Sequence, residues 1–196
     1  MSRTAQINRT TGETEIQVTL DLDGSGQGAR STGVGFFDHM LDLLARHGHL
    51  DLAVTADGDL QSGSHHTVED TGICIGQALD QALGDRSGIC RYGHAVVPMD
   101  EARASVAVDI SGRGFLVFEA VLATGAIGNF EHELVQEFFQ ALAVNAKLTL
   151  HITVEAGSNV HHIIEAVFKA VARALRGAVL IDPDERGVPS TKGTLT

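Results

Sequence analysis

The stretch SGSHHTVEDTGICIG, residues 62–76, decides the fold, because a diverged copy of it, GSNVHHIIEAVFKA, occupies residues 157–170. Both copies contain the pattern His-His-x-x-Glu, which is formed by His65, His66 and Glu69 and again by His161, His162 and Glu165. A pattern that recurs 96 residues further along a chain of 196 residues indicates that the chain consists of two related halves.

The segments around each copy follow the same order. In the first half, alternating apolar residues predict strands within residues 13–26 and 49–56, and helical spacing predicts helices over residues 36–48 and 67–83. In the second half, strands are predicted over residues 101–114 and 147–156 and helices over 130–146 and 161–179, with 115–122 as the hairpin partner of the strand before it. The sequence therefore predicts an α+β fold, an internal duplication of a strand–strand–helix–strand–helix half. Residues 1–196 would form one unit of two fused repeats, about 1–93 and 94–196, since no Pro- or Gly-rich linker separates them.

Composition and charge exclude several classes of protein. The net charge of −11 argues against nucleic acid as a partner, because phosphate backbones are bound through clustered Lys and Arg. No apolar run approaches the roughly 18 residues that span a bilayer, and the N-terminal residues lack the apolar core of a signal peptide. The two cysteines are too few for a disulfide framework. We expect a cytoplasmic protein of a reducing compartment, with no membrane association.

The His-His-x-x-Glu pattern has the chemistry of a metal site. In a helix, Glu69 can neighbour both His65 and His66, because residues three and four apart share a face. The two adjacent histidines point about 100° apart and cannot comfortably bind the same ion. Two copies of the pattern therefore suit two metal ions better than one.

The types of ligand limit which metal ions are expected. Imidazole and carboxylate without thiolate favour Mn, Fe, Ni or Zn over soft copper or an iron–sulfur cluster. His39 in FFDHML and Glu137 in LVQEFF occupy matching places in the two halves and are candidate further ligands. The plainer interpretation is that these side chains cap helices or face solvent, and recurrence of the pattern in both halves is what favours metal binding.

Several basic residues indicate an anion-binding pocket. Arg91 in GICRYG, Arg113 in DISGRG and Lys192 in PSTKG stand beside glycine, where the backbone can approach a phosphate or carboxylate. Lys169 lies two turns along its helix from His161. The tail could be a flexible end, or it could fold over a phosphate and donate hydrogen bonds from Ser190, Thr191 and Lys192.

Taken in order, the motifs FFDHML, HHTVED, CRYG, DISGRG, HHIIEA and PSTKG resemble the imidazoleglycerol-phosphate dehydratase family of histidine biosynthesis over essentially the whole chain. The resemblance implies a duplicated fold similar to domain 2 of ribosomal protein S5, assembled as a 24-subunit shell with sites between subunits. It implies a hydro-lyase that converts imidazole glycerol phosphate to imidazole acetol phosphate and uses two Mn²⁺ per active site. Some relatives carry a fused phosphatase domain, and we expect this chain to be monofunctional.

The resemblance also assigns the residues. The metal ligands carry over to His39, His65, His66, Glu69, His161, His162 and Glu165, and to Glu137, where many relatives have histidine. The substrate contacts carry over to Glu13, Arg91, Arg113, Lys169, Ser190 and Lys192, beside which Thr191 is a further candidate. We hypothesise that the metals stabilise an imidazolate form of the substrate ring, that loss of the neighbouring hydroxyl leaves a diazafulvene-like intermediate, and that Glu13 performs the proton transfer.

Two other functions remain open from the residues alone. A dinuclear metallohydrolase could use the same ligands with a metal-bound hydroxide as nucleophile. Such sites usually contain bridging carboxylates, however, whereas most candidate ligands here are imidazoles. A metal-buffering or metal-sensing protein would explain the histidines, but it would leave Arg91, Arg113 and the PSTKG tail without a role.

Overall fold

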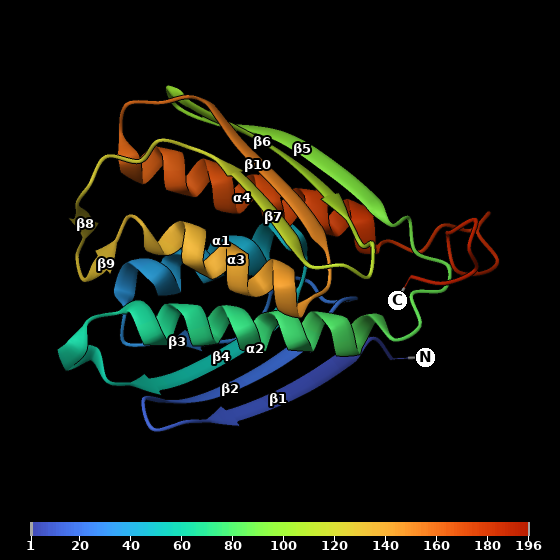
Figure 1. Cartoon of the computed structure of the whole chain (residues 1–196), viewed down its shortest axis with the longest axis horizontal. Coiled ribbons are helices and arrows are strands. Elements are labelled where there is room, and N and C mark those ends of the chain that lie inside the picture. The colour runs from blue at the N-terminus through green and yellow to red at the C-terminus, as the bar shows by residue number, and fades with distance from the viewer. Residues whose placement is uncertain (1, 196) are drawn as a thin grey trace.

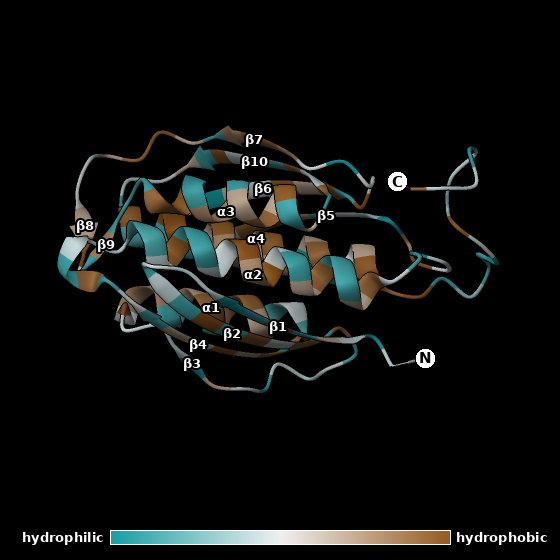
Figure 2. Ribbon diagram, turned by 60° about the horizontal axis from the view of Figure 1, so that its bottom comes forward, coloured by the Kyte–Doolittle hydropathy of each residue, from teal (hydrophilic) through white to brown (hydrophobic). Residues whose placement is uncertain are grey.

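The computed structural model describes residues 2–195, in which four helices lie between two four-stranded sheets (Figures 1 and 2). Alternation in the sequence produces this arrangement. Along β2, for example, Ile16, Val18 and Leu20 are all buried while the residues between them are exposed. Each sheet therefore presents one apolar face to the helices and one polar face outward. No helix among residues 2–195 combines the length and hydropathy that a membrane span requires.

The first half contributes one sheet and two helices. Its elements are β1 (Thr4–Thr10), β2 (Thr14–Asp21), β3 (Arg30–Ser31), α1 (Gly35–Gly48), β4 (Asp51–Gly58), the single 3-10 turn η1 (Leu60–Ser62) and α2 (His65–Leu83). The strands are ordered β1-β2-β4-β3, and α2 packs on β1 and β2.

The second half repeats this arrangement. Its elements are β5 (Tyr92–Met99), β6 (Ala102–Asp109), β7 (Phe115–Glu119), α3 (Leu134–Asn145), β10 (Thr149–Ala156) and α4 (Val160–Val179), with the short pair β8 (Ala126–Ile127) and β9 (Phe130–Glu131) inserted before α3. The strand order β5-β6-β10-β7 matches that of the first half element by element, which confirms the predicted α+β duplication. The proposed boundary at residues 93 and 94 lies within β5.

One strand pairing differs from the prediction. The segment 115–122 was expected to form a hairpin with the strand before it, but β7 pairs in parallel with β10, with Thr149 opposite Phe115. The hairpin partner of β6 is instead β5, and β1 holds the same position beside β2. Both β1 and β5 are edge strands with largely exposed side chains, so the apolar signal that identified their neighbours is weak in them. The helix expected over residues 130–146 is also shorter, because Phe130 and Glu131 belong to β9.

The helices pair across the two halves. Helix α1 packs against α4, and α3 packs against α2. Glycines on α2 allow the close approach of α3, since a Cβ at Gly72 would stand 2.8 Å from the carbonyl oxygen of Phe138 and one at Gly76 would stand 2.8 Å from that of Leu142. Phe37 of α1 meets Phe138 of α3 edge-on with ring centroids 5.3 Å apart, and Phe168 of α4 stacks on Phe138 at 5.4 Å, so one aromatic cluster joins both halves. Each helix pair therefore takes one member from each repeat.

Candidate metal centre and active site

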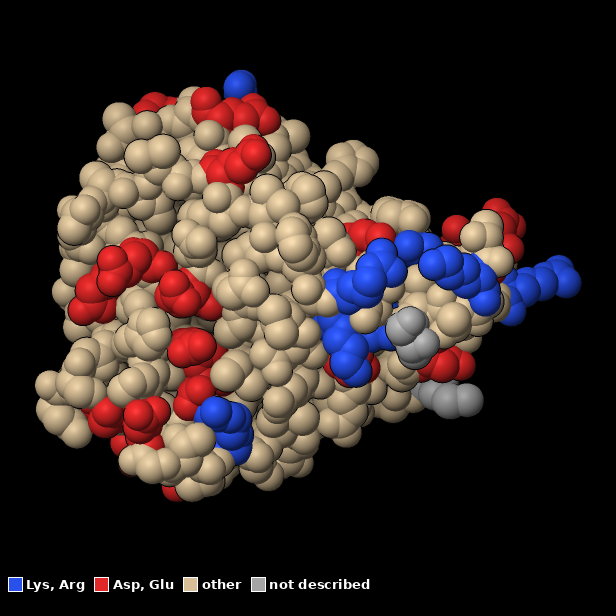
Figure 3. Space-filling model, in the orientation of Figure 1, with Lys and Arg blue, Asp and Glu red and all other residues tan. Residues whose placement is uncertain are grey.

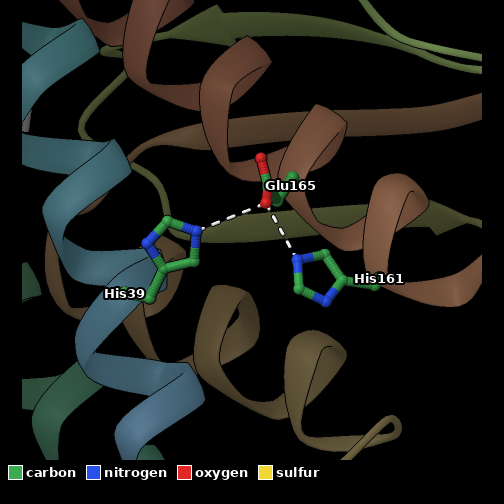
Figure 4. A group of neighbouring side chains, drawn as sticks. All are labelled: His39, His161 and Glu165. Atoms are coloured by element: carbon green, nitrogen blue, oxygen red, sulfur yellow. Dashed lines mark hydrogen bonds and ion pairs between the residues drawn. The ribbon is translucent and has the colours of Figure 1, made fainter.

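Three predicted ligands meet where α1 packs on α4 (Figure 4). The Nε2 atom of His39 lies 3.3 Å from Oε1 of Glu165, and the Nε2 atom of His161 lies 2.9 Å from the same oxygen. The ligand atoms of these three residues all lie within 4.8 Å of one another, and no other group of three such side chains does so among residues 2–195. The two imidazoles and one carboxylate form a donor set that fits Mn²⁺, Fe²⁺ or Zn²⁺.

The charge of Glu165 is stabilised by its neighbours. Burial opposes ionisation of this carboxyl group, but hydrogen bonds from Lys169, His39 and His161 outweigh the effect of burial and lower its pKa to about 2. Lys169 lies one turn further along α4, and its Nζ atom is 2.6 Å from Oε2. Glu165 is therefore an anion at neutral pH, with Oε2 bound by Lys169 and Oε1 directed at the histidines.

The second histidine of each pair points away from the first. The ring centroids lie 6.2 Å apart in His161 and His162 and 6.0 Å apart in His65 and His66, and the two rings of each pair have different partners. The first member of each pair faces its own glutamate, with Nε2 of His65 lying 3.3 Å from Oε2 of Glu69. The second member faces acidic residues outside its own helix: His66 lies beside Asp59 and Glu13, and His162 lies beside Glu101 and Asp100.

The remaining predicted ligands do not join the cluster within one chain. His65, His66, Glu69 and His162 lie at the N-terminal ends of α2 and α4, and Glu137 lies half-buried in the first turn of α3. Because α3 packs on α2, Glu137 occupies in that helix pair the place that His39 occupies in the pair of α1 and α4. The two helix pairs thus carry related donor sets.

The predicted anion-binding residues line one cavity of about 790 Å³ between the C-terminal tail and the ends of β5 and β6. Arg91, Arg113, Ser190, Thr191 and Lys192 all contribute to its wall, whereas Lys169 does not. Basic side chains gather at this end of the molecule, over the C-terminal segment (Figure 3).

The two arginines of the cavity differ in their contacts. Arg91 donates from Nε and Nη2 to Asp109, at 2.7 and 3.2 Å, and from Nη1 to the carbonyl oxygen of Pro189 at 2.8 Å. It therefore connects the tail to the sheet. The guanidinium of Arg113 makes no hydrogen bond or ion pair with residues 2–195 and is exposed, so it is free to bind an anion.

The candidate metal-binding cluster and the basic cavity lie at opposite ends of α4. His161 lies in the first turn of this helix, whereas the backbone N–H of Arg91 donates to the carbonyl oxygen of Ala178 near its last residue. A helix rises by about 25 Å over that interval. One chain therefore presents the two sites on distant parts of its surface.

The sequence that builds these sites matches a known family over most of its length. The family model described as imidazoleglycerol-phosphate dehydratase matches residues 32–175. The chain belongs to this family. It is therefore an enzyme, a hydro-lyase of histidine biosynthesis.

Relatives and solved structures agree with this assignment over the full length. The imidazoleglycerol-phosphate dehydratase of Acidiphilium cryptum (strain JF-5) is 58% identical over 196 residues, covering 100% of both chains, and that of Ruegeria sp. (strain TM1040) is 59% identical over 194 residues, covering 98% of this chain and 100% of the relative. The crystal structure of the Staphylococcus aureus subsp. aureus N315 enzyme is similar with a TM-score of 0.83, at 44% identity over 91% of this chain and 99% of that one. The Pyrococcus furiosus structure has a TM-score of 0.82 at 38% identity, covering 96% and 100%.

The predicted acid–base residue of this dehydratase-family chain is exposed. Glu13 occupies the turn between β1 and β2, and its Oε1 atom lies 3.7 Å from Nε2 of His66. Its carboxylate accepts no hydrogen bond from residues 2–195. The turn itself is held by Thr14, whose hydroxyl donates to the buried carboxylate of Asp70 at 2.6 Å.

Sequence reasoning missed two acidic residues beside the histidines. Asp59 accepts from Nδ1 of His66, at 3.1 and 3.2 Å for its two oxygens, and Glu101 accepts from Nδ1 of His162 at 2.8 Å. Neither residue belongs to a repeated motif of the histidine pairs. The signal for Glu101 was its position at the start of a predicted strand, which matches the position of Glu13. The signal for Asp59 was the loop before the first pair, which contains it and is two residues longer than the loop before the second.

Proposed function

We propose that the chain removes water from imidazole glycerol phosphate to give imidazole acetol phosphate, in a reaction that depends on Mn²⁺ with two ions per active site. The convergence of His39, His161 and Glu165 is the observation that carries the metal dependence. Family membership supplies the substrate and the product.

The residues of the cluster would hold the ion through two imidazole Nε2 atoms and one carboxylate oxygen. Bound there, the ion would supply positive charge that stabilises the ionised imidazole ring of the substrate. Lys169 would hold the other oxygen of Glu165, which keeps the carboxylate charged and oriented toward the site.

Glu13 would move the proton. The reaction requires a group that can take a proton from carbon, and a carboxylate without donors of its own is available for that work. Glu13 lies beside Nε2 of His66, one of the nitrogens assigned to a metal, so it would lie next to a ring bound at that position.

The phosphate would bind in the basic cavity. Arg113 and Lys192 offer cations with no partner among residues 2–195, and Ser190 and Thr191 offer hydroxyl groups beside them. Arg91 would act mainly by holding the tail in place through Pro189. A phosphate anchored in this cavity would fix the position of the substrate relative to the metals.

The separation of the two sites supports active sites shared between chains. Ring and phosphate of the substrate are joined by a three-carbon chain, which spans well under about 10 Å at ordinary bond lengths. Cluster and cavity of one chain lie farther apart than this along α4. We therefore propose that each site combines the cluster of one copy with the cavity of another, in a homo-oligomer for which the family resemblance gives 24 subunits.

The cytoplasm is the proposed location. Cys74 and Cys90 are both free, which fits a reducing compartment, and biosynthetic relatives act on a small phosphorylated metabolite.

The deciding experiment measures turnover of imidazole glycerol phosphate by protein stripped with a chelator and assayed with and without added Mn²⁺. The ketone product is followed by its absorbance in alkali. We expect product only when metal is present. A folded, metal-loaded protein that forms no product would overturn the proposal and favour the hydrolase or metal-buffer function.

A further inference from the structure

The two halves of the chain use an equivalent glutamate differently. Glu13 and Glu101 occupy the same place in two matching turns, one between β1 and β2 and the other between β5 and β6. In both halves, the second histidine of the repeated pattern lies beside the turn. Residues at equivalent positions would be expected to make equivalent contacts, but the contacts of Glu13 and Glu101 differ.

In the second half, Glu101 is fully engaged. Its Oε2 atom accepts from Nδ1 of His162 at 2.8 Å. Its Oε1 atom accepts from the backbone N–H groups of Ser158 and Asn159, at 3.1 and 2.7 Å. This carboxylate therefore fixes both the imidazole and the loop that leads into α4.

In the first half, Asp59 makes the contact with histidine. Both of its oxygens lie near Nδ1 of His66, at 3.1 and 3.2 Å. The hydroxyl of Ser62 donates to the same carboxylate at 2.6 Å, and the backbone N–H of Asp59 donates to the carbonyl oxygen of Glu13 at 3.0 Å. Asp59 belongs to the segment that makes this loop two residues longer than its counterpart.

The consequence concerns Glu13. With Asp59 on the Nδ1 side of His66, the carboxylate of Glu13 lies on the Nε2 side, 3.7 Å away and without a hydrogen bond from residues 2–195. On the corresponding side of His162 stands Asp100, 3.8 Å from Nε2 and largely exposed. A histidine that donates its Nδ1 proton to a carboxylate presents Nε2 as the ligating atom, in a fixed ring orientation.

We propose that Asp59 is a positioning residue for His66 and orients this imidazole as Glu101 orients that of His162. Because Asp59 occupies the Nδ1 side of His66, the carboxylate of Glu13 is left free for proton transfer. The inference rests on the proposed function, because it assigns His66 and His162 to metal ions. It predicts that Asp59 and Glu101 have the same role although they occupy different positions in their repeats. It also predicts that Glu13 and Glu101 have different roles although their positions are equivalent.

Three isosteric variants test this: Asp59→Asn, Glu101→Gln and Glu13→Gln. Mn²⁺ binding to the stripped protein is measured by equilibrium dialysis, independently of turnover, and melting temperature reports folding. We expect Asp59→Asn and Glu101→Gln each to weaken one class of Mn²⁺ site by about 10- to 100-fold with little change in melting temperature. Glu13→Gln should bind Mn²⁺ like the unaltered chain and lose kcat.

Two further variants act as controls. Asp57→Asn removes an exposed carboxylate from the end of β4, two residues before Asp59, and should leave both metal binding and kcat unchanged. Asp59→Glu restores the carboxylate on a longer side chain and should recover part of the lost affinity.

The possible failures separate the two proposals. Normal Mn²⁺ affinity in Asp59→Asn, or a loss of affinity in Glu13→Gln equal to that in Glu101→Gln, would overturn this inference while leaving the dehydratase intact. An unaltered chain that binds no Mn²⁺ at all would overturn the proposed function, and this inference with it.

Discussion

At the scale of single residues, Glu13 is notable because its carboxylate is exposed and accepts no hydrogen bond from residues 2–195. Replacing it by glutamine keeps the size of the side chain and removes its ability to take a proton. We expect Glu13→Gln to lower kcat by about a hundredfold or more while metal content stays the same. Glu15→Gln, which alters a neighbouring exposed carboxylate on β2, is the matched control and should be fully active. Near-normal turnover of Glu13→Gln would remove Glu13 from the mechanism.

Arg113 is expected to act on substrate binding. Its guanidinium is exposed in the wall of the basic cavity and has no partner among residues 2–195. We expect Arg113→Ala mainly to raise KM in steady-state assays, because a phosphate contact is made equally in the ground state and the transition state. Arg103→Ala, which breaks an exposed ion pair with Glu155, should change neither constant. A lower kcat at unchanged KM would place Arg113 elsewhere in the reaction.

The buried cysteine, Cys74, should be unreactive in the native protein. Burial raises the pKa of the Cys74 thiol to about 11, so the reactive thiolate is scarce until the pH approaches that value. We expect a thiol reagent at pH 8 to leave Cys74 unlabelled in the native protein and to label it after unfolding, as read by mass spectrometry of peptides. Rapid labelling of Cys74 without loss of structure would show that α2 opens locally.

The candidate metal ligands could be predicted from the sequence, whereas Asp59 could not. The candidate metal ligands stand out in the sequence because repetition and residue type both mark them, and the structure brings three of them, His39, His161 and Glu165, together. Asp59 was not predictable, because an aspartate in a polar loop has no pattern of its own and its contact with His66 depends on how the loop folds back. The division of roles between Asp59 and Glu13 is visible only in three dimensions.

At the scale of elements, the contact between β5 and α4 depends on a missing side chain. A Cβ at Gly93 would stand 1.9 Å from the carbonyl oxygen of Ala174, whereas one at Gly177 would meet its nearest neighbour at 3.7 Å. We expect Gly93→Ala to destabilise the fold by about 1–3 kcal/mol, because strand and helix must separate. Gly177→Ala, on the facing helix, should be stabilising by about 0.5–1 kcal/mol. Thermal unfolding followed by circular dichroism measures both, and equal melting temperatures would contradict the packing described.

The elements that the sequence predicted are those with a buried face. The central strands β2, β4, β6 and β10 and the four helices all carry strong apolar periodicity. The edge strands β1 and β5 do not, and they were missed. The pairing of β7 was wrong for a different reason: adjacency in sequence favours a hairpin, but repetition of the β3 position placed this strand parallel to β10. Recognising β7 as the counterpart of β3 would have required aligning a strand of five residues with one of two.

At the scale of the whole molecule, the distance between cluster and cavity predicts complementation between damaged chains. His39→Ala destroys the cluster and keeps the cavity, whereas Arg113→Ala impairs the cavity and keeps the cluster. If sites combine parts of two copies, co-expression of these variants creates some intact sites. At a substrate concentration well below the raised KM of Arg113→Ala, we expect activity well above that of either variant alone. Co-expression of His39→Ala with His161→Ala, which damages the same cluster twice, should restore nothing. Failure of the first pair to complement would place the complete site within one chain.

The pairing of helices across the repeats bears on how such a protein could have arisen. Because α1 packs on α4 and α3 on α2, neither repeat alone can bring His39 beside His161 and Glu165. A half-length ancestor would have built such a cluster only at the contact between two copies of itself, where helices of one copy pack on helices of the other. The present chain keeps that reciprocal contact and joins the two partners through residues 84–91, between α2 and β5. The cluster would thus be older than the covalent link, and what is now the interior of one subunit would once have been the contact between two.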